Sequence, residues 1–414
     1  MLLSELIRVF GRIGLLSFGG PAAQIALMHK ELVEDRDWLS EQDYLKALSF
    51  CMLLPGPEAM QLATYAGWKR AGILGGFIGG GLFVLPGAVV IAALALLYGR
   101  YGDLAIVQSL FLGVKACVVV IVLQALIKIS GRALVSRLHK WIAITTFIAL
   151  FAFQLPFPVV IVIAAILGAT HPAPNAPVST ASRPMLGTSI KTVLIGICVW
   201  LAPLVILAVT NQHLLFEIGK FFSVLAVVTF GGAYAVLSYM TQEVVVSYQW
   251  LSTQQMMDAL GLAETTPGPL ILVTQFVGML VGWMDNGIAG AIWAGLLTLW
   301  VTFVPCFIWI FAGAPLIDWL DSQPRLRSGL NAITAAVVGV IANLSLWFGL
   351  HVIFEDVTIQ SWSIISIPTP EISSVSWVAL VLTILSYFWL VHQRWSLPAT
   401  LGTCALIGVV MGSF

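Results

Sequence analysis

Long apolar runs follow one another along most of the chain, with short polar stretches between them. They lie at about 6–28, 72–98, 105–127, 141–169, 190–210, 218–240, 286–313, 329–350 and 376–414. Because one crossing of a bilayer takes roughly 20 residues, the runs predict an all-α polytopic membrane protein with roughly 9–11 membrane segments.

Two further apolar runs, around 47–66 and 256–282, contain the sequence Pro-Gly-Pro. Proline interrupts a helix, and a backbone break at membrane depth has to be buried in protein or to line a wet cavity. We therefore predict that both runs are broken or re-entrant helices.

The chain contains an internal duplication. When the sequence is shifted by 212 positions, residues 18–57 align without a gap on residues 230–269, with sixteen identities in forty. FGG, Trp-Leu-Ser and PGP all fall in this single register, which is typical of a repeated structural unit.

Positive charges in the short loops predict the relative orientation of the two copies, because they favour the cytoplasmic face. Loop 29–46 carries three Lys or Arg residues and loop 128–140 carries four, whereas their partners, 241–255 and 351–375, carry none. Equivalent loops are thus expected on opposite faces, which predicts inverted-topology repeats. The expected organisation is a first repeat over 1–169, a linker over 170–189, a joining transmembrane helix over 190–210 and a second, inverted repeat over 211–414.

The composition agrees with a membrane protein and argues against several other classes. Of the 414 residues, 59% are hydrophobic and 9% are charged, and Lys plus Arg balance Asp plus Glu at 19 each. No nucleic-acid-binding surface is therefore predicted. The five cysteines and six histidines are scattered, so neither a metal site nor a cofactor is expected. With no nucleophile or nucleotide-binding motif, an enzyme is not predicted.

The PGP motifs are the main candidate binding elements. Gly56 permits close backbone approach, and Pro57 suits the first turn of a new helix. The amide groups that follow lack helical partners, and such a helix start is a ready site for an anion. Candidate substrate-binding residues are Pro55, Gly56, Pro57, Glu58, Ala59 and Gln61 in the first half, and Thr265, Thr266, Pro267, Gly268 and Pro269 in the second.

The FGG motifs add small residues at equivalent positions of the two halves. Small residues in membrane helices either allow close packing or line a site, and both readings apply here. Candidates in this region are Gly19, Gly20, Pro21 and Gln24 in the first half, and Gly231 and Gly232 in the second.

Lys115 lies halfway along the apolar run 105–127, too far from either end to reach the membrane surface. An intramembrane cation is a functional candidate, although a structural pairing with a carboxylate is the alternative. Its counterpart in the second half is Asn331, so any cationic help for a bound anion would come from one half only.

Glu58 and Glu264 lie on opposite sides of their PGP motifs and are candidate coupling or gating groups. Glu58 would complement the helix dipole, a structural role, or would carry a proton in a dry interior. Glu31 and Glu243 are shared by both halves and are included as coupling or gating candidates. For these two, a capping role beside an interfacial tryptophan is favoured over a ligand role.

The stretches SFGGPAAQIALMHKELVEDRDWL, LLPGPEAMQLATYAGW and GGLFVLPG, with their echoes in the second half, closely resemble the long-chain, two-repeat form of the chromate ion transporter (CHR) family. The resemblance covers essentially the whole chain. It implies a multi-pass protein of the cell inner membrane that exports chromate and confers chromate resistance, with sulfate as a chemically similar competitor. Ala233 stands where the first half has Pro21, which is a departure between the two FGG regions.

Two alternatives stay open. An importer or exchanger of sulfate or a related oxyanion would share the fold and the site. A membrane-embedded enzyme acting on lipid would use Glu58 or Glu264 as a base, but the duplication argues against it. The expected partners are chromate and sulfate anions and the lipid bilayer, and a homodimer is left open.

Overall fold

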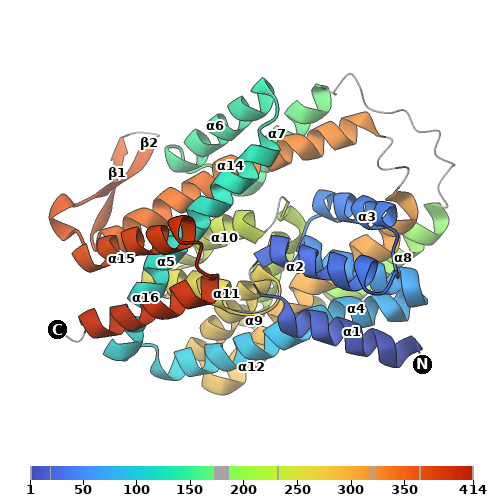
Figure 1. Ribbon diagram of the computed structural model, residues 1–414, viewed down its shortest axis with the longest axis horizontal. Coiled ribbons are helices and arrows are strands. Elements are labelled where there is room, and N and C mark those ends of the chain that lie inside the picture. The colour runs from blue at the N-terminus through green and yellow to red at the C-terminus, as the bar shows by residue number, and fades with distance from the viewer. Residues whose placement is uncertain are drawn as a thin grey trace. The chain divides into compact units, whose positions relative to one another are not determined.

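The computed structural model describes residues 2–18, 20–171, 186–230, 233–317, 319, 323–362 and 365–412. Nearly every element in these ranges is a helix (Figure 1). Five of the described helices are long and apolar enough to cross a bilayer, at Glu58–Tyr101, Ala105–Ala133, Ser189–Val209, Leu270–Leu316 and Pro324–Ile353. The chain is therefore an all-α polytopic membrane protein, as the apolar runs predict.

The helices form two compact units, and each unit draws on both halves of the sequence. Unit 1 comprises Met1–Gly99, Pro172–Val236 and Thr266–Arg327, and unit 2 comprises Arg100–His171, Leu237–Thr265 and Ser328–Phe414. Most of the predicted linker, 170–189, lies outside the described residues.

Unit 1 holds both PGP motifs. Its helices are α1 (Leu2–Leu16), α2 (Gly20–His29), η1 (Lys30–Glu34), α3 (Glu41–Leu53), most of α4 (Glu58–Tyr101), α8 (Leu186–Val209), α9 (His213–Val228), η3 (Leu270–Leu272), α12 (Val273–Gly313) and η4 (Ala314–Leu316). Helix α8 corresponds to the predicted joining helix, and it packs against α12 and α9.

The two longest helices of unit 1 each reverse direction early. Helix α4 is interrupted by non-helical backbone at Ala71 and Gly72, and α12 by the same pair of conformations at Asn286 and Gly287. Each therefore begins with a half-helix of about 13 residues, which at 1.5 Å per residue spans about 20 Å and is too short to cross a bilayer. A longer helix follows each turn.

Glycines let each half-helix pack closely against the helix that follows it. A side chain on Gly67 would collide with the carbonyl oxygen of Gly75, and one on Gly282 with that of Gly290. The same kind of close packing therefore closes both helical hairpins.

Two apolar runs predicted as single crossings in unit 1 are each divided into two helices. The run 6–28 becomes α1 and α2, and the run 218–240 becomes α9 and α10 (Ala233–Thr241). In the first run the helix ends before Ser17, and the chain turns through Gly20 at φ 76°. The single-span prediction was wrong here because the helices end just before Ser17 and Thr229, whose hydroxyls bond back to the preceding turn, although the hydropathy continues.

In unit 2, the run 141–169 becomes α6 (Arg137–Phe151) and α7 (Phe157–Thr170), and the run 376–414 becomes α15 (Trp377–Tyr387), η6 (Phe388–His392) and α16 (Leu397–Gly412). In both runs a residue with positive φ, Gln154 or Arg394, comes shortly before a proline and ends the first helix. Such short helices do not each need to cross the membrane.

Unit 2 is built around α5 (Ala105–Ala133), which packs against α16, α15 and α11 (Thr253–Thr265). It also contains η2 (Gln242–Ser247), α14 (Pro324–Ile353) and η5 (Ile372–Ser374), and α14 lies against α6 and α7 through glycine contacts. Its antiparallel strands β1 (Val357–Trp362) and β2 (Ile365–Pro370) pair Val357 with Pro370. The sequence did not predict this hairpin in the loop 351–375.

Backbone features recur at the spacing of the sequence repeat. Asp37 and Gln249, 212 positions apart, both have φ of 52°. The π-helical segments η1 and η2 precede them in the two halves, and Trp38 and Trp250 each donate a backbone hydrogen bond six residues back. Equivalent sequence thus folds into equivalent local structure in both halves.

Candidate functional site

The two PGP motifs are backbone breaks between helices. In the first break, Pro55–Gly56–Pro57, α3 ends at Leu53 and α4 begins at Glu58, with Gly56 at φ 111°. In the second break, Pro267–Gly268–Pro269, α11 ends at Thr265 and η3 begins at Leu270, with Gly268 at φ 89°. Only glycine adopts such φ values without strain, so both glycines are required by the backbone.

Each break is hydrogen-bonded to the other half of the sequence. The N–H of Gly56 donates to the carbonyl of Thr229 (2.9 Å), and the N–H of Gly268 donates to the carbonyl of Ser17 (2.8 Å). Ser17 and Thr229 are equivalent positions, immediately before the two FGG motifs. The four residues therefore form a reciprocal pair of contacts within unit 1.

The packing around each break also involves residues from the other half of the sequence. A side chain on Gly87, which follows Pro86 in α4, would collide with the carbonyl of Pro267 in the second break. Cys306, which follows Pro305 in α12, places its Sγ 2.9 Å from the Cβ position of Gly56 in the first break. Each break thus packs against a proline-containing stretch of the other half's long helix.

The residues before the FGG motifs end their helices in the same way. The hydroxyl of Ser17 donates to the carbonyl of Ile13 (2.6 Å), and that of Thr229 donates to the carbonyl of Leu225. Gly20 opens α2, followed by Pro21. The predicted site residues Gly19, Gly231 and Gly232 lie outside the described residues.

Gln24 and Gln61 bring side-chain amides to the two breaks. Gln24 Nε2 donates to the carbonyl of Gly268 (2.7 Å) and to that of Ser17 (3.3 Å), so a residue of the first half contacts the second break. Gln61 Nε2 donates to the carbonyl of Pro55 in the first break (2.7 Å). The two glutamines are 1% and 0% exposed.

The helix start after the first break carries the predicted Glu58 and Ala59. The first helical hydrogen bond there runs from Gln61 N–H to the Pro57 carbonyl, so the amides of residues 58–60 precede the helical ladder. Glu58 is partly buried and Ala59 is buried.

The second break lacks these polar neighbours on its following helix. Leu270 occupies the position equivalent to Glu58, and Thr266 is buried before Pro267. Thr265 is exposed and donates to the carbonyl of Leu262, and Glu264 is partly buried; both belong to the end of α11 in unit 2.

Lys115 pairs with Asp258 in unit 2. Its Nζ lies 3.0 Å from Asp258 Oδ1, and the two side chains are 3% and 0% exposed. This is the structural pairing that stood as the alternative for Lys115, whereas its counterpart Asn331 is exposed. Asp258 is not among the residues predicted from the sequence. Its signal was a lone carboxylate near the start of the apolar run 256–282, where a charge needs a partner.

Glu31 is a buried carboxylate of unit 1 that pairs with two more exposed arginines. Its carboxylate lies 2.5 Å from Arg36 and 3.5 Å from Arg12, and the Arg70 guanidinium lies 5.5 Å from the ring centre of Trp38. These contacts suit the structural role favoured for this acid. Glu243, its partly buried equivalent, has Val224 and Tyr248 at the positions of the two arginines.

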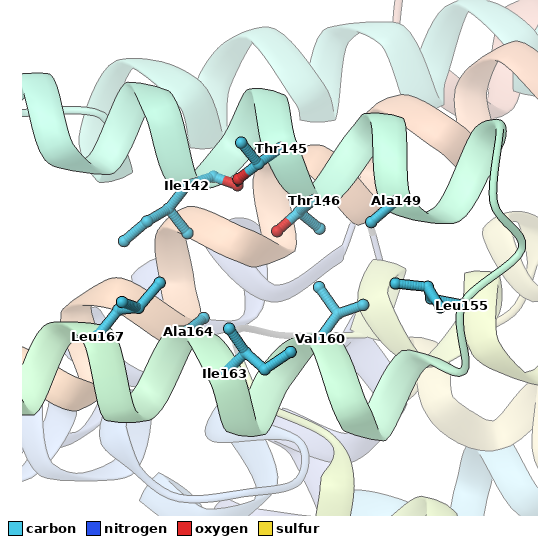
Figure 2. Close-up of a pocket in the computed structure, with 9 residues that line it drawn as sticks. All are labelled: Ile142, Thr145, Thr146, Ala149, Leu155, Val160, Ile163, Ala164 and Leu167. Atoms are coloured by element: carbon cyan, nitrogen blue, oxygen red, sulfur yellow. The ribbon is translucent and has the colours of Figure 1, made fainter.

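An outward-opening pocket lies between α6 and α7, where side chains of the two helices face each other (Figure 2). It has a volume of about 130 Å³ and is lined by Ile142, Thr145, Thr146, Ala149, Leu155, Val160, Ile163, Ala164 and Leu167. Its lining has no charged side chain and two hydroxyls, and the Thr145 hydroxyl already donates to the Trp141 carbonyl. Such a pocket suits an acyl chain better than an oxyanion.

These observations define the class of protein to which the chain belongs. The chain is a multi-pass helical membrane protein in which two interrupted helices, one in each half, meet within one compact unit. Discontinuous helices of duplicated origin are the architecture of secondary transporters. Over the described residues, no group of three His, Cys, Asp or Glu side chains is placed to hold a metal ion.

Comparison with known proteins then identifies the family. The sequence matches the chromate transporter family over residues 4–169 and 216–409, and the chain belongs to this family. The match covers both halves of the duplicated sequence.

Individual relatives agree with this assignment. The chain is 30% identical over 408 residues to a chromate transport protein of Cupriavidus metallidurans, covering 99% of this chain and 93% of the relative. It is 30% identical over 392 residues to a probable chromate transport protein of Synechococcus elongatus, covering 92% and 95%. An uncharacterized transporter of Methanocaldococcus jannaschii is 25% identical over 348 residues, covering 83% of each chain. No solved structure matches this chain significantly.

Proposed function

We propose that this protein is a secondary transporter that exports chromate across the inner membrane and thereby gives chromate resistance. Membership of the chromate transporter family supports chromate as the substrate. The observation that carries the site is the reciprocal pairing of the two breaks, because it joins both halves at the interrupted helices where such transporters bind their substrates.

The proposed binding site consists of the two breaks and the FGG regions that contact them. Chromate is a tetrahedral oxyanion, and the amides of residues 58–60 lie at a helix start, which favours negative charge. The backbone residues of the site are Gly19, Gly20, Pro21, Pro55, Gly56, Pro57, Ala59, Gly231, Gly232, Thr265, Thr266, Pro267, Gly268 and Pro269. Gln24 and Gln61 would complete it with side-chain amides.

We take the two halves to be inverted repeats, and the reciprocal contacts support this arrangement. Two equivalent elements that exchange the same hydrogen bonds are expected to be related by a two-fold axis, and the loop charges favour an axis in the membrane plane. Rocking of one element against the other would then open the site to each face in turn.

The membrane potential would favour export. With the cell interior negative, moving two negative charges outward gains about 4.6 kcal/mol per 100 mV, twice the value for a single charge. Import of the same anion would need co-transported cations. An importer of sulfate with this fold therefore requires a coupling ion that export of chromate does not.

Glu58 and Glu264 are the proposed coupling or gating acids. Glu58 stands beside the amides of the first break, where a protonated carboxyl tolerates a bound anion and an ionised one repels it. Glu58→Gln and Glu264→Gln together should abolish the pH dependence that these groups add to transport. Unchanged rates and unchanged pH dependence in the double variant would rule out this role.

Everted membrane vesicles test the proposed function. Labelled chromate should accumulate in the lumen when a lumen-positive potential is imposed with potassium and valinomycin, and vesicles without the protein are the control. Accumulation that needs a sulfate gradient would instead favour an exchanger. Absence of potential-dependent chromate flux would overturn the proposal.

A further inference from the structure

The pocket between α6 and α7 has two chemically different ends. At one end Ile142 and Leu167 face each other, and at the other end Leu155 lies in the turn that joins the two helices (Figure 2). The Ile142 end comes just over one helical turn after Arg137, where α6 begins. The pocket therefore runs from the charged start of α6 to the apolar turn at its far end.

The shape and lining of the pocket suit a hydrocarbon chain. Along α6 the lining extends from Ile142 to Ala149, which is about 10 Å at 1.5 Å per residue. Leu155, Ile163 and Leu167 at its rim are 39%, 49% and 42% exposed, so the pocket opens to the surroundings of the protein. In a bilayer those surroundings are acyl chains, and an aliphatic wall offers them close packing.

Four cations gather around the turn between α5 and α6. Lys128 and Arg132 belong to the end of α5, and Arg137 and Lys140 belong to the first turn of α6. All four are exposed. None forms an ion pair with a carboxylate in the described part of the chain. The start of α6 adds the positive end of its helix dipole to this cluster.

Membrane orientation alone does not account for this cluster. Lys and Arg determine on which face a loop lies, and acidic residues contribute little. Loop 29–46, which is expected on the same face, mixes its three Lys and Arg with six Asp and Glu, whereas loop 128–140 has four Lys and Arg and no acid. The missing acids leave an uncompensated positive charge, which attracts an anion.

The turn that carries the cations is held in place by local contacts. His139 Nδ1 lies 3.1 Å from the carbonyl oxygen of Ala133, and the Ser136 hydroxyl accepts from the His139 N–H (3.1 Å). Ala133 and Ala143 also share one buried hydrophobic cluster. The backbones of the α5 end and the α6 start are therefore fixed next to each other.

One face of α6 connects the cations with the pocket. Arg137, Trp141 and Thr145 follow one another at i, i+4 spacing and so lie along the same face. Thr145 lines the pocket, and Trp141 is 64% exposed. Exposed tryptophan is typical of the level of the lipid headgroups. The order along α6 is thus cation, interfacial ring and apolar pocket.

We propose that this pocket is a binding site for an anionic phospholipid of the leaflet on the side of loop 128–140. One acyl chain lies between α6 and α7, and the phosphate is held by the cations around the α5–α6 turn. Basic pockets between membrane helices are known to bind anionic headgroups in this way. The inference does not depend on which substrate the protein transports.

Lipid selectivity of the full-length protein tests the proposal. The protein is delipidated in a mild detergent, and binding of phosphatidylglycerol and of phosphatidylcholine with the same acyl chains is measured by native mass spectrometry. Phosphatidylglycerol should bind about tenfold or more tightly, because two or more cations near a membrane surface act on its charge. Equal affinities would overturn the proposal.

Variants of the cations test the headgroup end. The double variant Arg132→Gln, Arg137→Gln should bring the affinity for phosphatidylglycerol down to that for phosphatidylcholine and leave the latter unchanged. Lys69→Gln, which removes an exposed cation of unit 1 outside the cluster, is the control and should keep the tenfold preference. If Lys69→Gln lowered the preference as much, the charge effect would not be local and the proposal would fail.

A variant of the lining tests the acyl end. Ala149→Leu places a larger side chain in the pocket and should weaken binding of both lipids about tenfold. Ile144→Phe is its control, because Ile144 is 48% exposed on the same helix and does not line the pocket. Unchanged lipid binding in Ala149→Leu, or displacement of phosphatidylglycerol by excess inorganic phosphate, would contradict a site that holds an acyl chain.

A protein partner in the pocket would give a different result. If Ala149→Leu changed the oligomeric mass and not lipid binding, a second copy of the chain would cover the pocket and the proposal would be overturned. If Ala149→Leu does not fold, the arginine double variant still decides, since it changes exposed side chains only. None of these measurements uses chromate, so their failure and the failure of the proposed function are distinguishable.

Discussion

The first and second breaks share a backbone but differ in their polar side chains. Both have a glycine at positive φ, a donated hydrogen bond to the residue before FGG in the other half, and a hairpin of two helices behind them. Only the first is followed by an acid and a glutamine, Glu58 and Gln61. The second receives its glutamine, Gln24, from the other half. The duplication thus preserved the shape of the breaks and let their side chains diverge.

The helices that precede the two breaks, α3 and α11, differ in charge at one equivalent position. This difference gives the largest predicted effect on stability. Asp258 on α11 is buried against Lys115, whereas the equivalent position on α3 is Lys46, which is exposed. Lys115→Met or Asp258→Asn alone should cost about 3–5 kcal/mol of stability, because either change leaves a buried charge unpaired. Thermal unfolding in detergent measures the loss.

Two further variants control this experiment. Lys46→Met should change stability by about 0.5 kcal/mol or less, as is usual for surface positions. The double variant Lys115→Met, Asp258→Leu should recover most of the loss, since it removes both charges. A double variant no more stable than the single ones would argue against a simple ion pair.

Substituting the glycine of each break tests whether both breaks depend equally on a residue with positive φ. Gly56→Ala and Gly268→Ala should each cost about 1–3 kcal/mol through backbone strain and should abolish chromate transport. The new Cβ would lie 2.9 Å from Cys306 Sγ in the first case and 3.0 Å from Leu272 Cδ1 in the second. Vesicle flux and thermal unfolding report the two effects.

Gly11→Ala is the control for these two variants, because Gly11 has no positive φ and no atom within 4 Å of its Cβ position. It should leave flux and stability nearly unchanged. If Gly56→Ala abolished flux while Gly268→Ala did not, the two breaks would not be functionally equivalent.

Glu31 and Glu243 occupy equivalent positions in the two halves, but their loss should lower stability by different amounts. Glu31→Gln removes contacts to Arg12 and Arg36 and should cost about 1–2 kcal/mol, because a buried carboxylate with charged partners contributes more than a surface pair. Glu243→Gln, where the arginine positions hold Val224 and Tyr248, should cost less. Parallel melting curves of the two variants test this difference, and equal losses would contradict it.

The smallest effect concerns His29, which lies between two carboxylates at the end of α2. Its ring nitrogens lie 2.7 Å from Glu41 and 3.1 Å from Glu34. The hydrogen bond to Glu41, with a further contribution from Glu34, raises the pKa of His29 above its ordinary value. The protonated ring is therefore favoured in the folded protein.

Because the folded-state pKa is raised, this contribution is fully present below the ordinary pKa of about 6.5 and is lost as the pH rises through the folded-state pKa. His29→Asn should therefore lower stability by about 1 kcal/mol or less in acid and by nothing in alkali. Melting temperatures of both proteins from pH 5 to 9 check this. A difference in melting temperature between the two proteins that grows with pH would contradict this prediction.

The local features of the fold could be predicted from the sequence, but the long-range contacts could not. PGP, FGG and the repeat register are local signals, and they place both breaks correctly. The division of 6–28 was missed because Ser17 follows the end of one helix and Gly20 opens the next without ending the apolar run. The partners of the breaks were not predictable either, since Gln24 meets Gly268 across 244 positions and nothing in either stretch indicates the other.

The partners of buried charged residues could not be predicted from the sequence either. Lys115 was recognised because a lone cation stands out in an apolar run, but a single chain does not reveal which carboxylate neutralises it. Asp258 is a lone carboxylate near the start of the apolar run 256–282, but its pairing with Lys115 becomes evident only once α5 and α11 pack together.

The reciprocal hydrogen bonds also bear on how such a protein could have arisen. One half alone would leave the amide of Gly56 without the carbonyl that it uses here, so an ancestral single-copy chain would have needed a second copy of itself to complete the break. Gene fusion would then have made that partnership permanent. It would also have freed each copy to lose the polar groups that the other retained, which accounts for one glutamine now serving each break from the same half of the chain.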